Sequence, residues 1–255
     1  MTAQRLNIAY QIHWETSWHV GSGYRTVAVD RLARQRKLAS DSCQDATLRP
    51  FVPGAQVKGV LRHQSEKLAA SLGADVVDPH DRGQGQREPL ITNFQPLADS
   101  ELMIDRLYGS RYQGECLFCS DATPVNEAPA NELAARTRTG MDRATGTVKH
   151  QRLFTTQAAS VESGVLAGRI RARHRPGVLT LNDDGIPYEY ALLLAGLLSI
   201  DRLGGDKSAG RGGCRIELTK LVWNGEEKEP ETFLQCFLEE DDWAEWVEMI
   251  RKENA

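Results

Sequence analysis

The sequence feature that most constrains this chain is a glycine-rich segment between an apolar block and an alternating one. Residues 203–214 read Leu-Gly-Gly-Asp-Lys-Ser-Ala-Gly-Arg-Gly-Gly-Cys, so five glycines surround the cations Lys207 and Arg211. The apolar block Tyr188–Leu203 predicts a buried helix, and the alternation of Cys214–Trp223 predicts a strand. Glycines permit positive φ and close backbone approach, and successive N–H groups can cradle an anion. We therefore expect either a phosphate-binding loop or a helix end closed by flexible glycines.

Composition indicates an ordinary globular protein without a membrane span. The chain has 255 residues, of which 40% are hydrophobic and 26% are charged. It lacks an apolar run of about 18 residues and a leader-like N-terminus, so we expect a cytoplasmic protein with no membrane partner. Its five cysteines are odd in number and scattered, which argues against a disulfide framework.

The distribution of charge is more informative than the net charge of −4. Residues 226–255 hold eleven acidic and three basic side chains, so the first 225 residues carry a balance of +4. Of the 31 basic residues, 23 are arginine, the side chain that binds phosphate in a bidentate manner and stacks on bases. An arginine-rich body followed by an acidic tail is compatible with RNA binding.

Hydrophobic patterns predict an alternation of strands and helices around one sheet. Two strand–helix–strand halves give a ferredoxin-like α+β core within residues 1–225, and residues 226–255 form an acidic helical segment packed on the same domain. The expected strands are 5–14, 114–121, 161–175 and 214–223, and the expected helices are 53–72, 188–203 and 232–252. Residues 107–111 are expected to turn, and residues 25–50 and 73–96 are expected to form long loops.

A basic hairpin is predicted at about residues 130–158. Alternation places Arg136 and Arg138 on one strand face, with Arg143 beyond them and glycines at positions 140 and 146 bracketing the tip. The segment has too little apolar content to be core, so it should project from the body as a thumb. Arg169, Arg171, Arg173 and Arg175 likewise alternate on a later strand, which predicts an exposed basic face.

The start of the first helix is a second candidate anion site. Lys58 and Arg62 are four residues apart, so they lie on one face of the first turns. A helix N-terminus itself favours anions because its backbone N–H groups and dipole point at the ligand.

Taken together and in order, these elements resemble the RAMP superfamily (repeat-associated mysterious proteins), the RNA-binding subunits of CRISPR effector complexes. The matching segments are His19-Val-Gly-Ser-Gly23, Pro53-Gly-Ala-Gln-Val-Lys-Gly-Val-Leu-Arg62, Leu107-Tyr-Gly109, Arg138-Thr-Gly-Met-Asp-Arg-Ala-Thr-Gly146 and Leu203–Gly213. Ala55 and Gln56 replace the two serines usual in the second segment. Within the superfamily, the chain looks most like the repeated backbone subunit of type III complexes.

The resemblance implies partners, a binding surface and an activity. Copies of the chain and other effector subunits would stack along the CRISPR RNA, while the thumb kinks the duplex of guide and target RNA. The implied RNA-binding residues are His19, Ser22, Lys58, Arg62, Arg136, Arg138, Arg143, Gly204, Gly205, Lys207, Ser208 and Arg211.

The resemblance also implies a catalytic aspartate in the loop after the first strand. Asp30 matches the family pattern best, with Asp41 and Asp45 as competitors. Such an endoribonuclease would cut target RNA by metal-assisted attack of a ribose 2′-hydroxyl, with Asp30 holding Mg²⁺ or another divalent metal. The alternatives are a non-catalytic scaffold or cap of the same complex and a metal-independent guide-processing nuclease that uses His13 or His19 as its base.

Overall fold

The structure is a computed structural model, and it describes residues 5–37, 48–72, 76, 103–109, 114–125, 133–173, 180–181 and 186–234. Asp41, Asp45, residues 77–96 and most of the predicted C-terminal helix lie outside the described residues. The elements in chain order are β1 (Arg5–Trp14), β2 (Gln35–Lys37), β3 (Leu48–Pro50), α1 (Gly54–Ser71), α2 (Met103–Tyr108), β4 (Leu117–Cys119), β5 (Thr123–Pro124), β6 (Ala134–Met141), β7 (Val148–Ala158), β8 (Leu166–Arg173), β9 (Thr180–Leu181), β10 (Ile186–Pro187), α3 (Tyr188–Leu198), β11 (Cys214–Trp223), β12 (Glu226–Glu227) and α4 (Pro230–Leu234).

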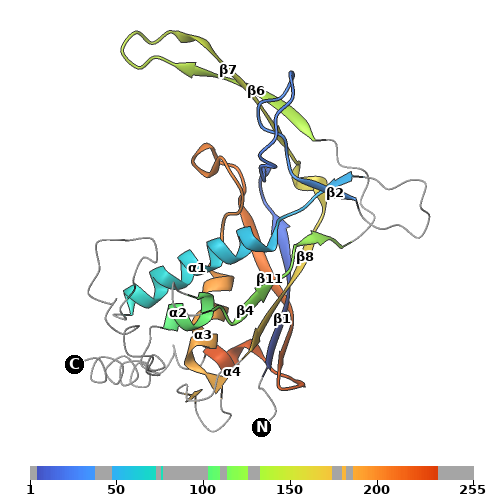
Figure 1. Cartoon of the computed structure of the whole chain (residues 1–255), viewed down its shortest axis with the longest axis vertical. Helices are drawn as coiled ribbons and strands as arrows, with labels where there is room; N and C mark the ends of the chain where they lie inside the picture. Colours follow the sequence, from blue (N-terminus) through green and yellow to red (C-terminus); the bar gives the residue numbers. More distant parts are fainter. Residues whose placement is uncertain are drawn as a thin grey trace.

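One antiparallel sheet forms the centre of the molecule (Figure 1). Its strand order is β12-β11-β1-β8-β4, and β5 pairs with β8 beside β4. The chain runs β1, α1, β4, β8, α3, β11, and it places β1 between β8 and β11. This order is that of a ferredoxin-like α+β fold, so the predicted fold class is confirmed.

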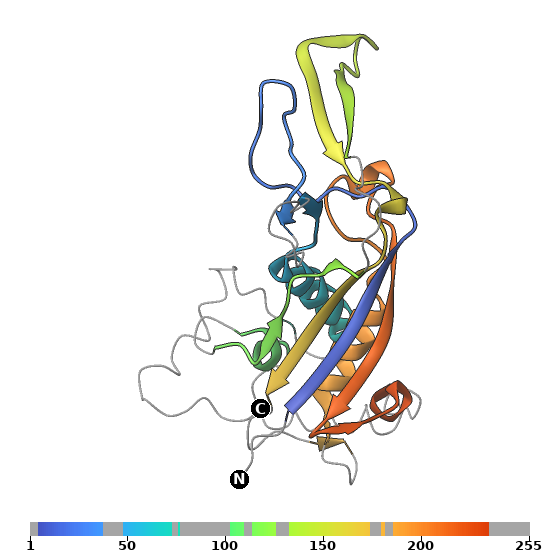
Figure 2. The ribbon, with the colours of Figure 1, turned by 90° about the vertical axis from the view of Figure 1, so that its right-hand side faces the viewer.

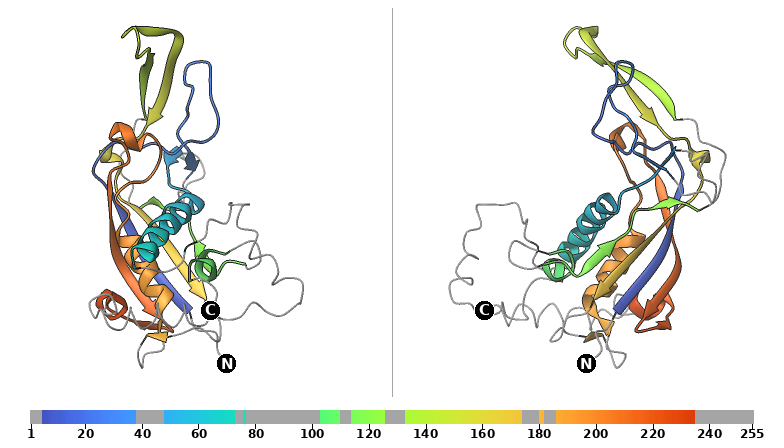
Figure 3. Two further views of the ribbon diagram at one scale, coloured as in Figure 1. Left: turned by 90° about the vertical axis from the view of Figure 1, so that its left-hand side faces the viewer. Right: turned by 45° about the vertical axis from the view of Figure 1, so that its right-hand side comes forward.

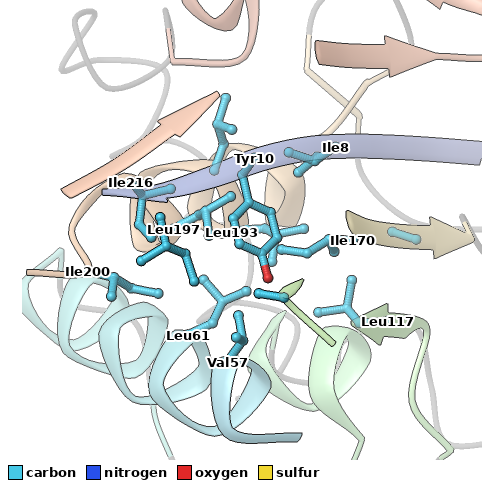
Figure 4. Close-up of a cluster of buried hydrophobic side chains, with 14 of the residues drawn as sticks. Ile8, Tyr10, Val57, Leu61, Leu117, Ile170, Leu193, Leu197, Ile200 and Ile216 are labelled. Carbon is cyan, nitrogen blue, oxygen red and sulfur yellow. The ribbon is translucent and has the colours of Figure 1, made fainter. Parts of the chain in front are cut away.

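The helices cover one face of the sheet, and strand alternation explains why (Figure 2). Along β1, every second side chain from Leu6 to Trp14 is buried, and the intervening ones are more exposed. Figure 4 shows the core where Tyr10 and Ile170 of the sheet meet Leu61 of α1 and Leu193 of α3. Each such large apolar side chain stabilises the fold by about 1.5–3 kcal/mol.

The predicted basic hairpin corresponds to β6 and β7, which extend away from the body of the protein (Figures 1 and 3). Its outer part is exposed on both strands, whereas Thr156 and Ala158 at the base of β7 are buried. The turn lies at residues 142–147, and Gly140 belongs to β6 at a register shift rather than to the tip.

Several predicted boundaries differ from the structure. The strand predicted at 161–175 begins only at Leu166, because a short 3₁₀ helix occupies Val161–Ser163. The strand predicted at 114–121 is limited to β4, and α3 ends at Leu198 rather than 203. Residues 107 and 108 of the turn predicted at 107–111 belong to α2, which stops where Gly109 takes a φ of 85°, and residues 110 and 111 lie outside the described part of the chain.

The fold also bears on membrane association. Among the residues described, none of the helices is both long and apolar enough to cross a bilayer.

Candidate nucleic-acid interface

Three segments that are far apart in sequence meet at the base of the hairpin. The loop after β1 runs beside β7, where the backbone of Arg31 pairs with that of Thr156 as an isolated parallel β-bridge. The carbonyl oxygen of Arg31 accepts the N–H of Gln157 at 3.0 Å. The glycine-rich loop joins them because the Gly205 N–H donates to the carbonyl oxygen of His19 at 2.7 Å. Backbone hydrogen bonds therefore fix the relative positions of hairpin, loop and glycine-rich segment.

At this junction three arginines surround one carboxylate. Asp206 lies 3.4 Å from Arg31, 3.3 Å from Arg138 and 3.3 Å from Arg211, each distance being guanidinium Nη1 to carboxylate oxygen. We call these four residues the hairpin-base cluster. Each arginine comes from a different segment, so the carboxylate links all three segments through its side chain.

Asp206 can occupy this position because aspartate tolerates the left-handed backbone conformation. Its φ is 59° and its ψ is 29°, and it precedes the 3₁₀ helix Lys207–Ala209. Its carbonyl oxygen accepts the N–H of Ala209 at 2.9 Å. The local backbone therefore holds the carboxylate toward the hairpin.

The cluster carries an excess of positive charge. Three guanidinium groups face one carboxylate, and arginine remains protonated in proteins. Arg211 is only 3% exposed, and burial, followed by the neighbouring Arg138, lowers its pKa. Arg31 is 57% exposed and stacks 5.8 Å from the centre of the Phe154 ring, which orients it by a cation–π contact. The solvent side of the cluster therefore favours an anion.

One part of the glycine-rich loop packs closely against the backbone of His19, and another part is exposed to solvent. Gly204 has a φ of 96°, and a Cβ atom there would lie 2.5 Å from the His19 carbonyl oxygen. Lys207 and Ser208 lie in the exposed part of the loop. Among the described residues, no acceptor takes up the backbone N–H of Lys207 or that of Ser208. Because α3 ends at Leu198, the glycines do not close that helix; they pack the loop against His19. Phosphate binding by the loop remains a prediction.

His19 and Ser22 lie inside the junction. The His19 ring is 4% exposed, and its Nδ1 lies 2.6 Å from the Gln157 carbonyl oxygen, so Nδ1 carries the proton and donates. Burial lowers the pKa of His19, and the positive charges of Arg211 and Arg31 add to this effect. Ser22 donates its hydroxyl to the Leu32 carbonyl oxygen and accepts the Tyr24 N–H. Both side chains organise the loop, and RNA contact by them remains a prediction.

Asp30 is exposed at the edge of the same junction. Its Oδ2 accepts the Thr155 N–H at 2.7 Å, and its own N–H donates to the Thr155 carbonyl oxygen at 3.0 Å. Oδ1 accepts no hydrogen bond from the described part of the chain. The aspartate therefore joins the loop to the hairpin and keeps one oxygen open to solvent.

Lys58 and Arg62 both pair with acidic side chains of the chain itself. Lys58 forms an ion pair with Glu115. Arg62 lies 2.8 Å from Glu66 and 3.6 Å from Asp105, and it donates to the Gly109 carbonyl oxygen at 3.1 Å. These contacts tie α1 to α2 and to the segment before β4. The RNA-binding role of Lys58 and Arg62 remains a prediction.

A preformed metal centre is not present among the residues that can be described. No group of three or more His, Cys, Asp or Glu side chains there could hold an ion. Mg²⁺ in nucleic-acid sites commonly takes only one or two carboxylates and completes its shell with phosphates and water. The open oxygen of Asp30 fits such a partial site, in which RNA would supply further ligands.

Sequence reasoning misses the residue at the centre of the junction. Asp206 lies within the glycine-rich loop, but the sequence singles out only the cations beside it, and Arg31 is one of several clustered basic residues. A signal exists, since an aspartate between Gly205 and Lys207 suits a left-handed position. The three partners of this aspartate, however, depend on tertiary contacts.

Fold and junction define an antiparallel ferredoxin-like protein with a basic, projecting hairpin. The sequence profile of the RAMP superfamily matches residues 12–215, which is more than half of the chain. The chain therefore belongs to the RAMP superfamily, and this membership places it among the CRISPR-associated RNA-binding subunits. No curated protein sequence matches it significantly.

Proposed function

We propose that this protein is a backbone subunit of a type III CRISPR effector complex that holds guide RNA at the hairpin base and cleaves paired target RNA there. The observation that carries the proposal is the hairpin-base cluster, where three arginines share the single carboxylate of Asp206. The subunit would act in the cytoplasm with CRISPR RNA, target RNA, other effector subunits and further copies of itself.

The exposed groups around the cluster would bind the guide backbone. Lys207 and Ser208 present their side chains and N–H groups in the glycine-rich loop, and Arg136 is exposed two residues before Arg138 on β6. Arg31 adds a half-exposed guanidinium. A phosphate placed here would meet an excess positive charge that Asp206 offsets only in part. Arg143, near the hairpin tip, would contact the more distant part of the RNA.

Asp30 is the residue that we assign to cleavage. It lies beside the Arg31 of the cluster, and its hydrogen bonds to Thr155 fix it at the hairpin base. When bound through Oδ1, Mg²⁺ would supply charge neutralisation at the scissile phosphate. Arg31 would neutralise negative charge in the same place, and guide pairing would supply the orientation of the reacting 2′-hydroxyl. Asp41 and Asp45 remain the competing candidates.

The same geometry also favours the second candidate function, a non-catalytic guide-binding scaffold or cap. One oxygen of Asp30 is already occupied by a backbone N–H, as in an aspartate that only stabilises a loop. Among the described residues, Asp30 belongs to no group of three or more His, Cys, Asp or Glu side chains that could hold an ion. A scaffold would keep the cluster and use Asp30 structurally.

Cleavage in the assembled complex separates the two functions. We expect wild-type protein, guide RNA, partner subunits and Mg²⁺ to cut complementary RNA to a cyclic phosphate and a 5′-hydroxyl. The Asp30→Asn variant should assemble normally and lose cleavage by at least tenfold, whereas Asp201→Asn, which changes an exposed carboxylate just before the glycine-rich loop, should cut like wild type.

Each other outcome has a distinct meaning. Cleavage by Asp30→Asn at the wild-type rate, with loss in Asp41→Asn or Asp45→Asn, would transfer the catalytic role to that residue. Absence of cleavage by wild-type complex that retains its guide would favour the scaffold. Purified wild-type protein without RNA, judged by its ultraviolet absorbance ratio and by failure to bind added guide, would contradict both functions.

A further inference from the structure

The face of the sheet opposite the helices is open to solvent. Figure 2 shows β8, β1 and β11 in front of α1 and α3. On β8 the pattern alternates strictly from Gly168 to Arg173, with every second residue buried. This face is separate from the hairpin base, because β8 runs from the hairpin end toward the opposite end of the molecule.

Three exposed arginines lie along β8 on this face of the sheet. Arg169, Arg171 and Arg173 alternate along the strand, so neighbouring Cα atoms in the series are about 6.6 Å apart. Within the part of the chain that the structure describes, none of the three has an acidic partner at ion-pair distance. Two other charged groups on the face do have acidic partners, namely His13 with Glu217 at 2.9 Å and Lys220 with Glu227 at 3.5 Å.

An aromatic side chain lies beside this series. Phe118 on β4 is 62% exposed, and strand register places it directly opposite Arg171. A hollow of about 860 Å³ opens at this point, with Arg5, Phe118, Arg171 and Arg173 among its lining residues. The hollow is large enough for a nucleotide, and its lining offers one aromatic ring and three guanidinium groups. The one carboxylate in the lining, that of Glu115, forms an ion pair with Lys58.

This combination is typical of surfaces that bind single-stranded nucleic acid. Such surfaces join a positive track for the phosphates to aromatic side chains on which bases stack. An acidic peptide would pair with the arginines, but it would gain little from an exposed phenyl ring. Phe118 contributes little to the core at this exposure, so its ring is available for stacking.

We propose that the open sheet face is a second RNA-binding surface, on which Phe118 stacks on a base and the arginines of β8 hold the adjoining phosphates of a single strand. The ligand is a short unpaired RNA segment, distinct from the segment held at the hairpin base. Because the two surfaces share no residue, substitutions can abolish RNA binding at one surface without changing the other.

Photocrosslinking of the full-length chain tests the location of this surface. The probe is an unstructured RNA oligonucleotide that contains 4-thiouridine, and mass spectrometry identifies the attached peptides. We expect attachment to the peptide that holds Phe118 as well as to peptides from the hairpin base. The Lys207→Ala/Arg136→Ala variant should lose hairpin-base attachment and keep attachment at Phe118.

Fluorescence anisotropy with the same RNA in the Lys207→Ala/Arg136→Ala background tests the energetic contribution. Phe118→Ala should weaken binding about fivefold or more, consistent with loss of one stacked base. Arg169→Gln/Arg171→Gln should also weaken it and reduce the salt slope by about 0.7 for each phosphate that the variant no longer neutralises. Lys67→Ala, which removes an exposed charge from α1, should bind like its parent.

The proposal fails if Phe118→Ala and the arginine variant bind RNA like their parent, or if crosslinks appear only at the hairpin base. Loss of an acidic protein partner from these variants, with RNA binding unchanged, would assign the face to protein recognition instead. Crosslinking at Phe118 alone, with none at the hairpin base in wild type, would support this surface and contradict the proposed function.

Discussion

The Asp206 carboxylate lies 3.3 Å from the guanidinium of Arg138, and this ion pair joins the glycine-rich loop to the hairpin. The carboxylate is 13% exposed and also pairs with Arg31 and the buried Arg211. Without Asp206, three positive groups would face one another with no counter-charge. The Asp206 carboxylate therefore adds side-chain links to the backbone hydrogen bonds that hold the base of the hairpin.

Replacement of Asp206 by alanine should loosen the hairpin base. We expect the free energy of unfolding to fall by about 2 kcal/mol, because the buried Arg211 loses its partner. Hydrogen exchange should accelerate at the amides of Thr155 and Gln157, which bond to the loop after β1. Asp201→Ala, which removes a 78% exposed carboxylate from the same region, is the matched control. Equal exchange in the two variants would show that Asp206 does not hold the hairpin.

Two glycines of α1 should respond in opposite directions to alanine. A Cβ atom at Gly54 would lie 2.1 Å from the Cys119 carbonyl oxygen, whereas at Gly59 it would meet nothing within 4 Å. Gly54→Ala should lower the free energy of unfolding by about 2–3 kcal/mol because α1 must move away from β4. Gly59→Ala should raise it by about 0.5–1 kcal/mol through helix propensity. Urea denaturation measures both, and equal stability of the two variants would contradict the packing of α1 on β4.

Protonation of His19 should destabilise the fold at acidic pH. Burial lowers its pKa in the folded state, so the unfolded chain binds the proton more readily. Stability therefore falls as the pH decreases through the unfolded value of about 6.5 toward the lower folded pKa. The His19→Asn variant, which keeps a donor for Gln157, should show a smaller decrease in unfolding free energy between pH 7 and 5. His63→Asn, on the exposed side of α1, should retain the wild-type pH profile.

The buried ion pair between Arg106 and Glu189 should be sensitive to loss of one partner. The two side chains are 8% and 6% exposed, and they lie 3.4 Å apart between α2 and α3. Arg106→Met should lower the free energy of unfolding by about 3 kcal/mol, because it leaves the carboxyl of Glu189 buried without its cation. The double variant Arg106→Met/Glu189→Met should recover most of that loss. A double variant no more stable than Arg106→Met would show that the pair is not the source of the effect.

Local patterns were sufficient to predict most of the core from the sequence. Alternation, strict in β1 and interrupted once in β11, identified these two strands because it indicates a strand with one buried face. The apolar block identified α3, because a helix that is apolar all round is buried. The order of these elements then specified the ferredoxin-like topology. The limits of β4 and the start of β8 were wrong because pairing with neighbouring strands, rather than their own residues alone, determines them.

The candidate site was less accessible to sequence reasoning. The arginines of the glycine-rich loop and hairpin were recognised from composition, but their common partner was not. Arg31 and Asp206 are 175 positions apart, and no local pattern connects them. Glu115 and Asp105, which pair with Lys58 and Arg62, were missed for the same reason, since they approach α1 only in the folded chain. Glu66, the other partner of Arg62, lies four residues further along α1, so helical spacing could have identified it.

The salt dependence of guide-RNA binding tests the central claim most directly. The Lys207→Ala/Arg136→Ala variant removes two positive charges beside the hairpin-base cluster, and Lys67→Ala/Lys228→Ala removes two elsewhere. If the hairpin base holds the guide, the first variant should bind more weakly, and its slope of log K against log salt should decrease by about 0.7 for each phosphate left without its cation. The control should keep the wild-type slope. Identical slopes in wild type and both variants would contradict the assignment of this surface to RNA.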